Sequence, residues 1–229
     1  MNRLFIWLFV FFGITHVFAQ EEPIKEVDSL YKEDQFYAGV TYNLLGNRSD
    51  NFSQSGFSLG FHLGFIKDTP INKARNIAIG IGLGYSANSY NQNLLINRDK
   101  SNTFTYTIID SDTFSKNKFS NHLIEVPIEF RWRTSTPTVY NFWRIYTGIK
   151  VGYVLTHTTK YKGDLGTFKY NNNNDFNNLQ YGLTLSAGYN TWNVYLYYAL
   201  NPIFSNKAQL NGNSIDANAI KVGLMFYIL

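Results

Sequence analysis

Cysteine is absent from the 229-residue sequence, which excludes disulfides, thiolate metal sites and cysteine nucleophiles. The sequence also lacks a large excess of charge of either sign, since 20 basic residues against 16 acidic ones give a formal charge of +4. The basic residues are scattered along the chain, so their excess gives no support to nucleic-acid binding. We expect a single sizeable domain with no nucleic-acid partner.

Long apolar runs are missing everywhere except near the start. Leu4–Phe12 is an unbroken apolar run after a short basic segment, and residues 17–19 offer small or modest side chains where a signal peptidase cleaves. These features predict a signal peptide over residues 1–19. A transmembrane anchor is the alternative, but Thr15 interrupts the run before the roughly 20 apolar residues that a spanning helix needs. We therefore expect an exported protein that is either soluble or a β-barrel.

Residues 20–34 form a strongly charged segment with acidic side chains at six positions. The segment is too polar to enter a bilayer, so we predict a charged periplasmic leader ahead of a barrel domain over residues 35–229. A mobile leader is one interpretation, and a leader that tucks into the mouth of the barrel is the other.

Aromatic residues are abundant, with 17 Tyr, 19 Phe and 4 Trp, as is typical of strands and membrane interfaces. Many belong to a strict alternation, in which Phe57, Leu59 and Phe61 are separated by Ser58 and Gly60. A period of two predicts strands with one apolar face. It recurs in eight segments, which cover residues 36–43, 57–65, 77–85, 124–132, 143–155, 179–189, 194–200 and 220–228.

Most of these segments reach about 9–11 residues, the length that crosses a bilayer at a tilt, whereas globular strands are nearer 5–6. Their connections alternate between long, Asn-rich ones and short ones, as in outer-membrane barrels. We therefore predict an all-β fold: an eight-stranded antiparallel transmembrane up-and-down β-barrel in the outer membrane, with both termini periplasmic. The long connections are 44–55, 91–120, 158–178 and 201–218, and the short ones are 67–76, 134–141 and 190–193.

Aromatic side chains also recur near the predicted periplasmic strand ends, where an interface girdle in contact with outer-membrane lipid would lie. The competing fold is a soluble barrel of the lipocalin type, with its apolar residues inward. Strand length and the girdle favour the membrane barrel, as do the glycines and charges on the opposite strand face. The predicted girdle consists of Phe65, Trp132, Trp143, Trp192 and Phe226.

The inward face of the fourth and fifth predicted strands carries five charges: Glu125, Glu129, Arg131, Arg144 and Lys150. A short turn would set Arg131 opposite Arg144 and Glu125 opposite Lys150, with Glu129 diagonal to Arg144. Eight strands leave an interior just wide enough for side chains to fill. The five residues could form a charge network that acts as a polar path or gate, or a structural plug of mutually paired charges. We favour the plug.

No catalytic residue, metal-ligand set or cofactor site stands out, and we predict a non-enzymatic protein without cofactor or metal. His62, His122 and His157 lie on different predicted strands, without carboxylates at metal-ligand spacing. His157 could serve an enzyme built at the outer rim, but no accompanying Ser and Asp pattern stands out.

Three stretches resemble the PorT-like, porin-family outer-membrane proteins of the Bacteroidetes: residues 61–93, residues 124–131 with Pro127 inside a strand, and residues 146–153. The resemblance implies an outer-membrane barrel of a Gram-negative envelope. It further implies a role in type IX protein secretion or envelope assembly, with envelope or secretion-machinery proteins as partners. A structural or adhesive surface barrel and a narrow solute channel are the alternative functions.

Overall fold

The computed structural model describes residues 32–49, 51–101, 103–135 and 142–228. The predicted signal peptide and most of the predicted leader lie outside the described residues. Within the described residues, no helix has the length and apolar character needed to cross a membrane.

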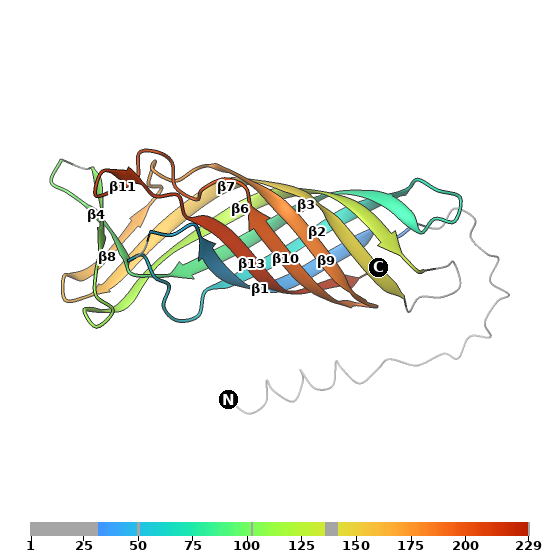
Figure 1. Ribbon diagram of the computed structural model, residues 1–229, viewed down its shortest axis with the longest axis horizontal. Helices are drawn as coiled ribbons and strands as arrows, with labels where there is room; N and C mark the ends of the chain where they lie inside the picture. The colour runs from blue at the N-terminus through green and yellow to red at the C-terminus, as the bar shows by residue number, and fades with distance from the viewer. Residues whose placement is uncertain (1–31, 50, 102, 136–141, 229) are drawn as a thin grey trace, which may run out of the picture.

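Eight antiparallel strands form a closed wall, which confirms the predicted fold class (Figure 1). Each wall strand pairs with the wall strand that follows it along the chain, so the topology is up-and-down. The first wall strand pairs with the last over eleven residue pairs, and this pairing closes the barrel. The wall strands are β1 (Gln35–Gly46), β2 (Leu59–Pro70), β3 (Ile77–Asn91), β6 (Phe114–Arg133), β7 (Trp143–Gly163), β9 (Leu179–Tyr189), β10 (Trp192–Ala199) and β13 (Asn218–Ile228).

The apolar face of each wall strand points outward. Leu63 and Leu83 are 57% and 62% exposed, whereas the neighbouring inward positions of the wall are largely buried. A continuous apolar surface of this extent is unfavourable in water, at about 25 cal/mol for each Å² exposed. The outward orientation therefore fits a wall surrounded by lipid and excludes the lipocalin-type arrangement.

Inward-facing glycines make room for large aromatic side chains. Gly64 on β2 and Gly84 on β3 are paired across the two strands. A Cβ atom at either glycine would collide with the side chain of Tyr37 from β1. The glycines are thus required by the close approach of Tyr37, which fills this part of the interior.

The five predicted girdle residues all lie on the outer wall. Phe65 contacts Phe36, with ring centroids 5.0 Å apart, and Trp192 contacts Phe226 at 4.8 Å. Trp143 contacts Tyr189 at 5.4 Å, and Trp132 is 37% exposed. The rings form a partial belt toward the end of the barrel where β1 begins and β13 ends. Its role at a membrane interface stays a prediction.

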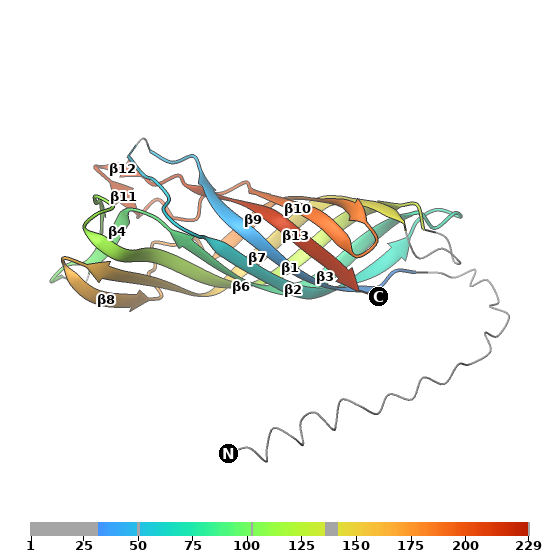
Figure 2. The same ribbon diagram turned by 90° about the horizontal axis from the view of Figure 1, so that it is seen from below.

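We call this end, with the connections after β2, β6 and β9, the short-turn end, and the opposite end the long-loop end (Figure 2). At the long-loop end, parts of the predicted long connections are themselves β-strands. The wall strands β6 and β7 continue as a paired ribbon well beyond the predicted segments. Five further strands lie in the long connections: β4 (Leu94–Arg98), β5 (Phe104–Ile108), β8 (Gly166–Asn171), β11 (Gln209–Leu210) and β12 (Asn213–Ser214).

Candidate functional site

The five predicted charged residues all lie buried inside the barrel, with Arg131 fully inaccessible and Glu129, the most accessible, only 5% exposed. Alternation along β6 and β7 directs them inward, as expected from a strand period of two. Their pairing differs from the prediction, because the register between β6 and β7 is shifted by two residues.

The actual register places Arg133 opposite Arg144 and Arg131 opposite Tyr146. Glu125 lies opposite Gly152 rather than Lys150, although the Lys150 side chain still reaches it. Glu129 forms its ion pair with Arg131, not with Arg144. A shift of two residues keeps every side chain on the same face, so alternation predicted the face correctly and the partners wrongly.

Asp68 on β2 holds the cluster nearest the short-turn end. Its carboxylate accepts two hydrogen bonds from Arg133, both 2.9 Å long, and one of 2.9 Å from Nη1 of Arg131. All three side chains are inaccessible to solvent. Bidentate arginine–carboxylate pairing is among the strongest charge-assisted hydrogen bonding, so one carboxylate joins β2 to two positions on β6.

Residues at and just before the start of β1 complete this cluster. Arg131 donates to the backbone carbonyl of Glu33 at 3.2 Å and to Oε1 of Gln35 at 2.6 Å. The Glu33 carboxylate lies 3.8 Å from Nε of Arg133 and is fully buried. The last residues of the predicted leader therefore enter the short-turn mouth, in line with the second of the two interpretations for that segment.

A second cluster forms around Glu125, in the middle of the barrel. Its carboxylate lies 3.3 Å from Nζ of Lys150 and 3.8 Å from Nζ of Lys221. Ser86 donates a hydrogen bond of 2.7 Å to it, and Nδ1 of His62 lies 3.8 Å away. Two lysines thus face one carboxylate, and each lysine also lies over a tyrosine ring, Lys150 over Tyr195 at 5.0 Å and Lys221 over Tyr197 at 4.8 Å.

Large side chains fill the space between the two clusters. The small cavity bounded by Tyr37, Ile66, Met225 and Tyr227 has no room for a water molecule. Buried ions are tolerated only where partners satisfy them, and here each of the two clusters has its own counter-charges. The lumen is packed and ion-paired, which suits a plug and does not suit an open path.

Arg144 is the exception among the predicted residues. Within the described part of the chain, no carboxylate lies within ion-pair distance of its guanidinium. The group instead lies 4.4 Å from the Phe142 ring centroid and 5.6 Å from that of Tyr227. Cation–π contacts of this kind offer partial compensation for a buried charge.

The predicted charge network lacks four acidic and basic residues of these clusters: Glu33, Asp68, Arg133 and Lys221. Alternation was sufficient to find two of them, since Arg133 continues the inward series of Glu129 and Arg131, and Lys221 lies between outward residues of the last strand. Asp68 lies in the predicted connection 67–76, because the apolar alternation ends at Phe65 whereas β2 continues for five more residues, to Pro70.

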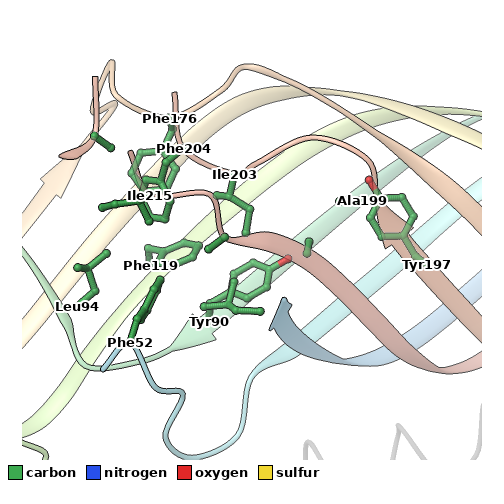
Figure 3. Close-up of a cluster of buried hydrophobic side chains, with 14 of the residues drawn as sticks. Phe52, Tyr90, Leu94, Phe119, Phe176, Tyr197, Ala199, Ile203, Phe204 and Ile215 are labelled. Carbon is green, nitrogen blue, oxygen red and sulfur yellow. The ribbon is translucent and has the colours of Figure 1, made fainter. Parts of the chain in front are cut away.

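The long-loop end is covered by a structured cap rather than by separate loops (Figure 3). Phe119 contacts Phe176 and Phe204, with ring centroids 5.5 Å apart in both cases, and Phe176 and Phe204 lie 4.6 Å apart. Each of the four long connections contributes to this buried core. The cap core comprises Phe52, Tyr90, Leu94, Ile96, Tyr106, Phe119, Phe176, Ile203, Phe204 and Ile215.

Buried hydrogen bonds tie the cap segments together. Tyr106 donates to Oδ2 of Asp175 at 2.9 Å and accepts from Nδ2 of Asn173 at 2.9 Å. Burial raises the pKa of the Tyr106 hydroxyl well above its ordinary value, so it remains a donor. Asn177 donates to the backbone carbonyls of Pro202 and Phe204, both at 2.9 Å. Asparagine thus links one connection to the next, beyond its role in turns.

A polar cleft of about 910 Å³ opens beside this core. One side comes from the β1–β2 connection, and the other from β5 and the β11–β12 hairpin. Asparagine is the most frequent lining residue, and three lining residues of mixed sign are charged: Arg48, Asp110 and Asp216. The volume lies at the upper end of the roughly 300–1,000 Å³ typical of small-molecule sites.

Among the described residues, no group of three histidine, aspartate or glutamate side chains is arranged to hold a metal ion. His157 lies against the Phe176 ring, with centroids 4.6 Å apart, and its Nε2 bonds the carbonyl of Asn173. His157 is therefore part of the cap packing. The absence of catalytic activity stays a prediction.

The family model described as an outer membrane protein beta-barrel domain matches residues 18–205 of the chain. A comparison with curated proteins finds no match. Among solved structures, Ail, the attachment invasion locus protein of Yersinia pestis, in complex with the heparin analogue sucrose octasulfate, covers 87% of this chain and 100% of its own, with 11% identity and a TM-score of 0.37. A triple mutant of Rhodopseudomonas blastica porin covers 86% and 100%, with 8% identity and a TM-score of 0.22. Likenesses this low carry no argument about function.

Replacing Asp68 with Asn tests the cluster at the short-turn end. Asp68→Asn leaves Arg131 and Arg133 buried with one fewer carboxylate, so we expect the free energy of unfolding to fall by about 3 kcal/mol. Urea unfolding of the refolded barrel in detergent measures the change. The control, Asp112→Asn, removes the same charge from an exposed position and is expected to leave stability nearly unchanged. Equal stability of the two variants would contradict the structural role of Asp68.

Proposed function

We infer that this chain, which belongs to the outer membrane protein beta-barrel domain family, acts through the cap at its long-loop end rather than through its lumen. The observation that carries this proposal is the shared hydrophobic core, in which all four long connections meet. Ordered, packed connections present a defined surface, whereas unstructured loops would not. The proposed function is recognition of a ligand at the cell surface by a non-enzymatic barrel.

The packed lumen supports this choice over a narrow channel. Ion pairs around Asp68 and Glu125 occupy the interior at two levels, and bulky side chains fill the space between them. Passage of a solute would require the simultaneous opening of both clusters and of the aromatic packing. The wall and lumen therefore serve as a rigid base for the cap.

The orientation that this function needs places the long-loop end outside the cell. Outer-membrane barrels have short periplasmic turns and longer extracellular loops, and the cap is built from the longer connections. The termini of the barrel then lie on the periplasmic side.

The cleft suits a neutral, hydroxyl-rich ligand such as a glycan. Asparagine amides offer both donors and acceptors, and the mixed charges of Arg48, Asp110 and Asp216 give no strong preference for a charged ligand. Ile108 and Leu210, both half-buried, add apolar contact surface of the kind that sugar rings use. These features support a glycan ligand for the proposed recognition function.

Because the chain lacks cysteine, single introduced thiols can test the orientation. Asn174 lies exposed in the cap and Lys73 lies exposed at the short-turn end. We expect a membrane-impermeant maleimide to label Asn174→Cys on intact cells, and to label Lys73→Cys only after the outer membrane is permeabilised. The reverse pattern would place the cap in the periplasm and contradict surface recognition.

Glycan binding tests the cleft directly. Asn51 and Asn213 lie on opposite sides of the cleft, exposed, in different connections. We expect the purified barrel to bind a subset of an immobilised glycan panel, and Asn51→Ala/Asn213→Ala to weaken that binding by about tenfold, as for the loss of one or two hydrogen bonds. Asn174→Ala/Asn178→Ala changes two exposed cap asparagines outside the cleft and is expected to bind normally. Equal loss in both double variants, or no glycan binding by the parent, would contradict the proposal.

The role in type IX secretion or envelope assembly rests on the family resemblance alone. It is tested by deleting the gene and quantifying secreted and surface proteins, with complementation. Trapped periplasmic precursors of many exported proteins would support a secretion role, whereas an unchanged secretome would leave the surface-recognition proposal as it stands.

A further inference from the structure

Five lysines that are dispersed in the sequence gather on one outer face of the long-loop end. We call them the lysine strip: Lys116 and Lys118 on β6, Lys160 and Lys162 on β7, and Lys169 on β8. The register sets Lys118 opposite Lys160, Lys116 opposite Lys162, and Lys160 opposite Lys169.

The lysine strip lies on the same face as the lipid-facing residues. Along β6 the outward series runs from Ile124 through His122 and Ser120 to Lys118, and all of these residues are exposed or half-buried. Along β7, Lys160 follows beyond Leu155, the last large apolar outward residue of that strand. The strip therefore begins where the apolar wall ends.

The charges of the lysine strip are uncompensated within the described protein. No described carboxylate lies within 4.0 Å of any of the five ammonium groups. Among the described residues, their ammonium groups make a single side-chain hydrogen bond, of 3.4 Å, from Lys118 to Oγ of Ser89. Like charges directly opposite each other destabilise a sheet, so the arrangement calls for an anion from outside the chain.

A groove of about 310 Å³ on the outer wall leads to the lysine strip. Its floor is formed by small side chains of β3, Ala87 and Ser89. One wall is apolar and highly exposed, with Phe61 55% and Phe57 79% accessible. The other wall is polar and includes Lys118.

We propose that this groove and the lysine strip bind a lipid with a phosphorylated headgroup from the outer leaflet. An acyl chain lies against Phe57 and Phe61, and the phosphate lies against Lys118 and Lys160. Cations beside an apolar groove at the edge of a lipid-facing wall match an amphiphile with an anionic head. A soluble anion would use only the lysines. The outer-leaflet source rests on the proposed orientation, whereas the lipid chemistry does not.

Thermal unfolding of the full chain in zwitterionic detergent tests the proposal with three probes: diphosphoryl lipid A, the same lipid without phosphates, and inorganic phosphate. We expect the unfolding midpoint to rise with the phosphorylated lipid and to stay unchanged with the other two. An equal rise with the phosphate-free lipid, or with inorganic phosphate alone, would overturn the proposal.

Charge-matched variants locate the site. For Lys118→Gln/Lys160→Gln, we expect the lipid A concentration needed for the same rise in unfolding midpoint to increase about tenfold. Without lipid, its unfolding midpoint should be no lower than that of the parent, because repulsion between the lysines is relieved. Lys67→Gln/Lys73→Gln removes two exposed lysines near the short-turn end and should respond as the parent does.

Ala87→Phe fills the floor of the groove and is expected to lose the lipid response with all lysines in place. A full response in both Lys118→Gln/Lys160→Gln and Ala87→Phe would refute the site. The groove and the cleft share no lining residue, so this test and the glycan-binding test can fail independently.

Discussion

Closure of the wall by the pairing of β1 with β13 is the constraint on which the rest of the structure depends. In lipid no water is available to bond an unpaired strand edge, so every backbone donor and acceptor of the wall must be paired within the protein. Closure also separates the inner face from the surroundings. The charges on that face then need partners inside the barrel. The clusters around Asp68 and Glu125 provide them for most of these charges, while Arg144 lies against aromatic rings.

The small circumference of the barrel has a functional consequence. Eight strands enclose a space that Tyr37, Tyr195 and Tyr227 largely occupy together with the ion pairs. A lumen filled in this way stabilises the wall and links β1, β2 and β6, but it leaves almost no open space through which a solute could pass. Recognition is therefore left to surfaces outside the lumen, at the cap and on the outer wall next to the long-loop end.

The cap and the lysine strip share one physical origin, which is the continuation of strand pairing beyond the apolar wall. The paired ribbon of β6 and β7 carries Phe119 inward into the cap core and Lys118 outward into the strip. Adjacent residues of one strand thus serve two surfaces, because successive side chains point to opposite faces. The β8 strand extends the same ribbon and adds Lys169 to the strip.

The sequence by itself determined the fold class, the outward apolar face and the inward charges, because alternation depends only on a strand period of two and is a local property. It did not determine register, since a shift of two residues preserves every face, and so the partners of Arg131, Glu129 and Arg144 were predicted wrongly. Nor did it reveal the cap, because single apolar residues such as Phe52, Phe176 and Phe204 have no periodic pattern in their Asn-rich surroundings. Only the tertiary structure brought those residues into one core and aligned scattered lysines across neighbouring strands, because both outcomes depend on contacts between segments far apart in the chain.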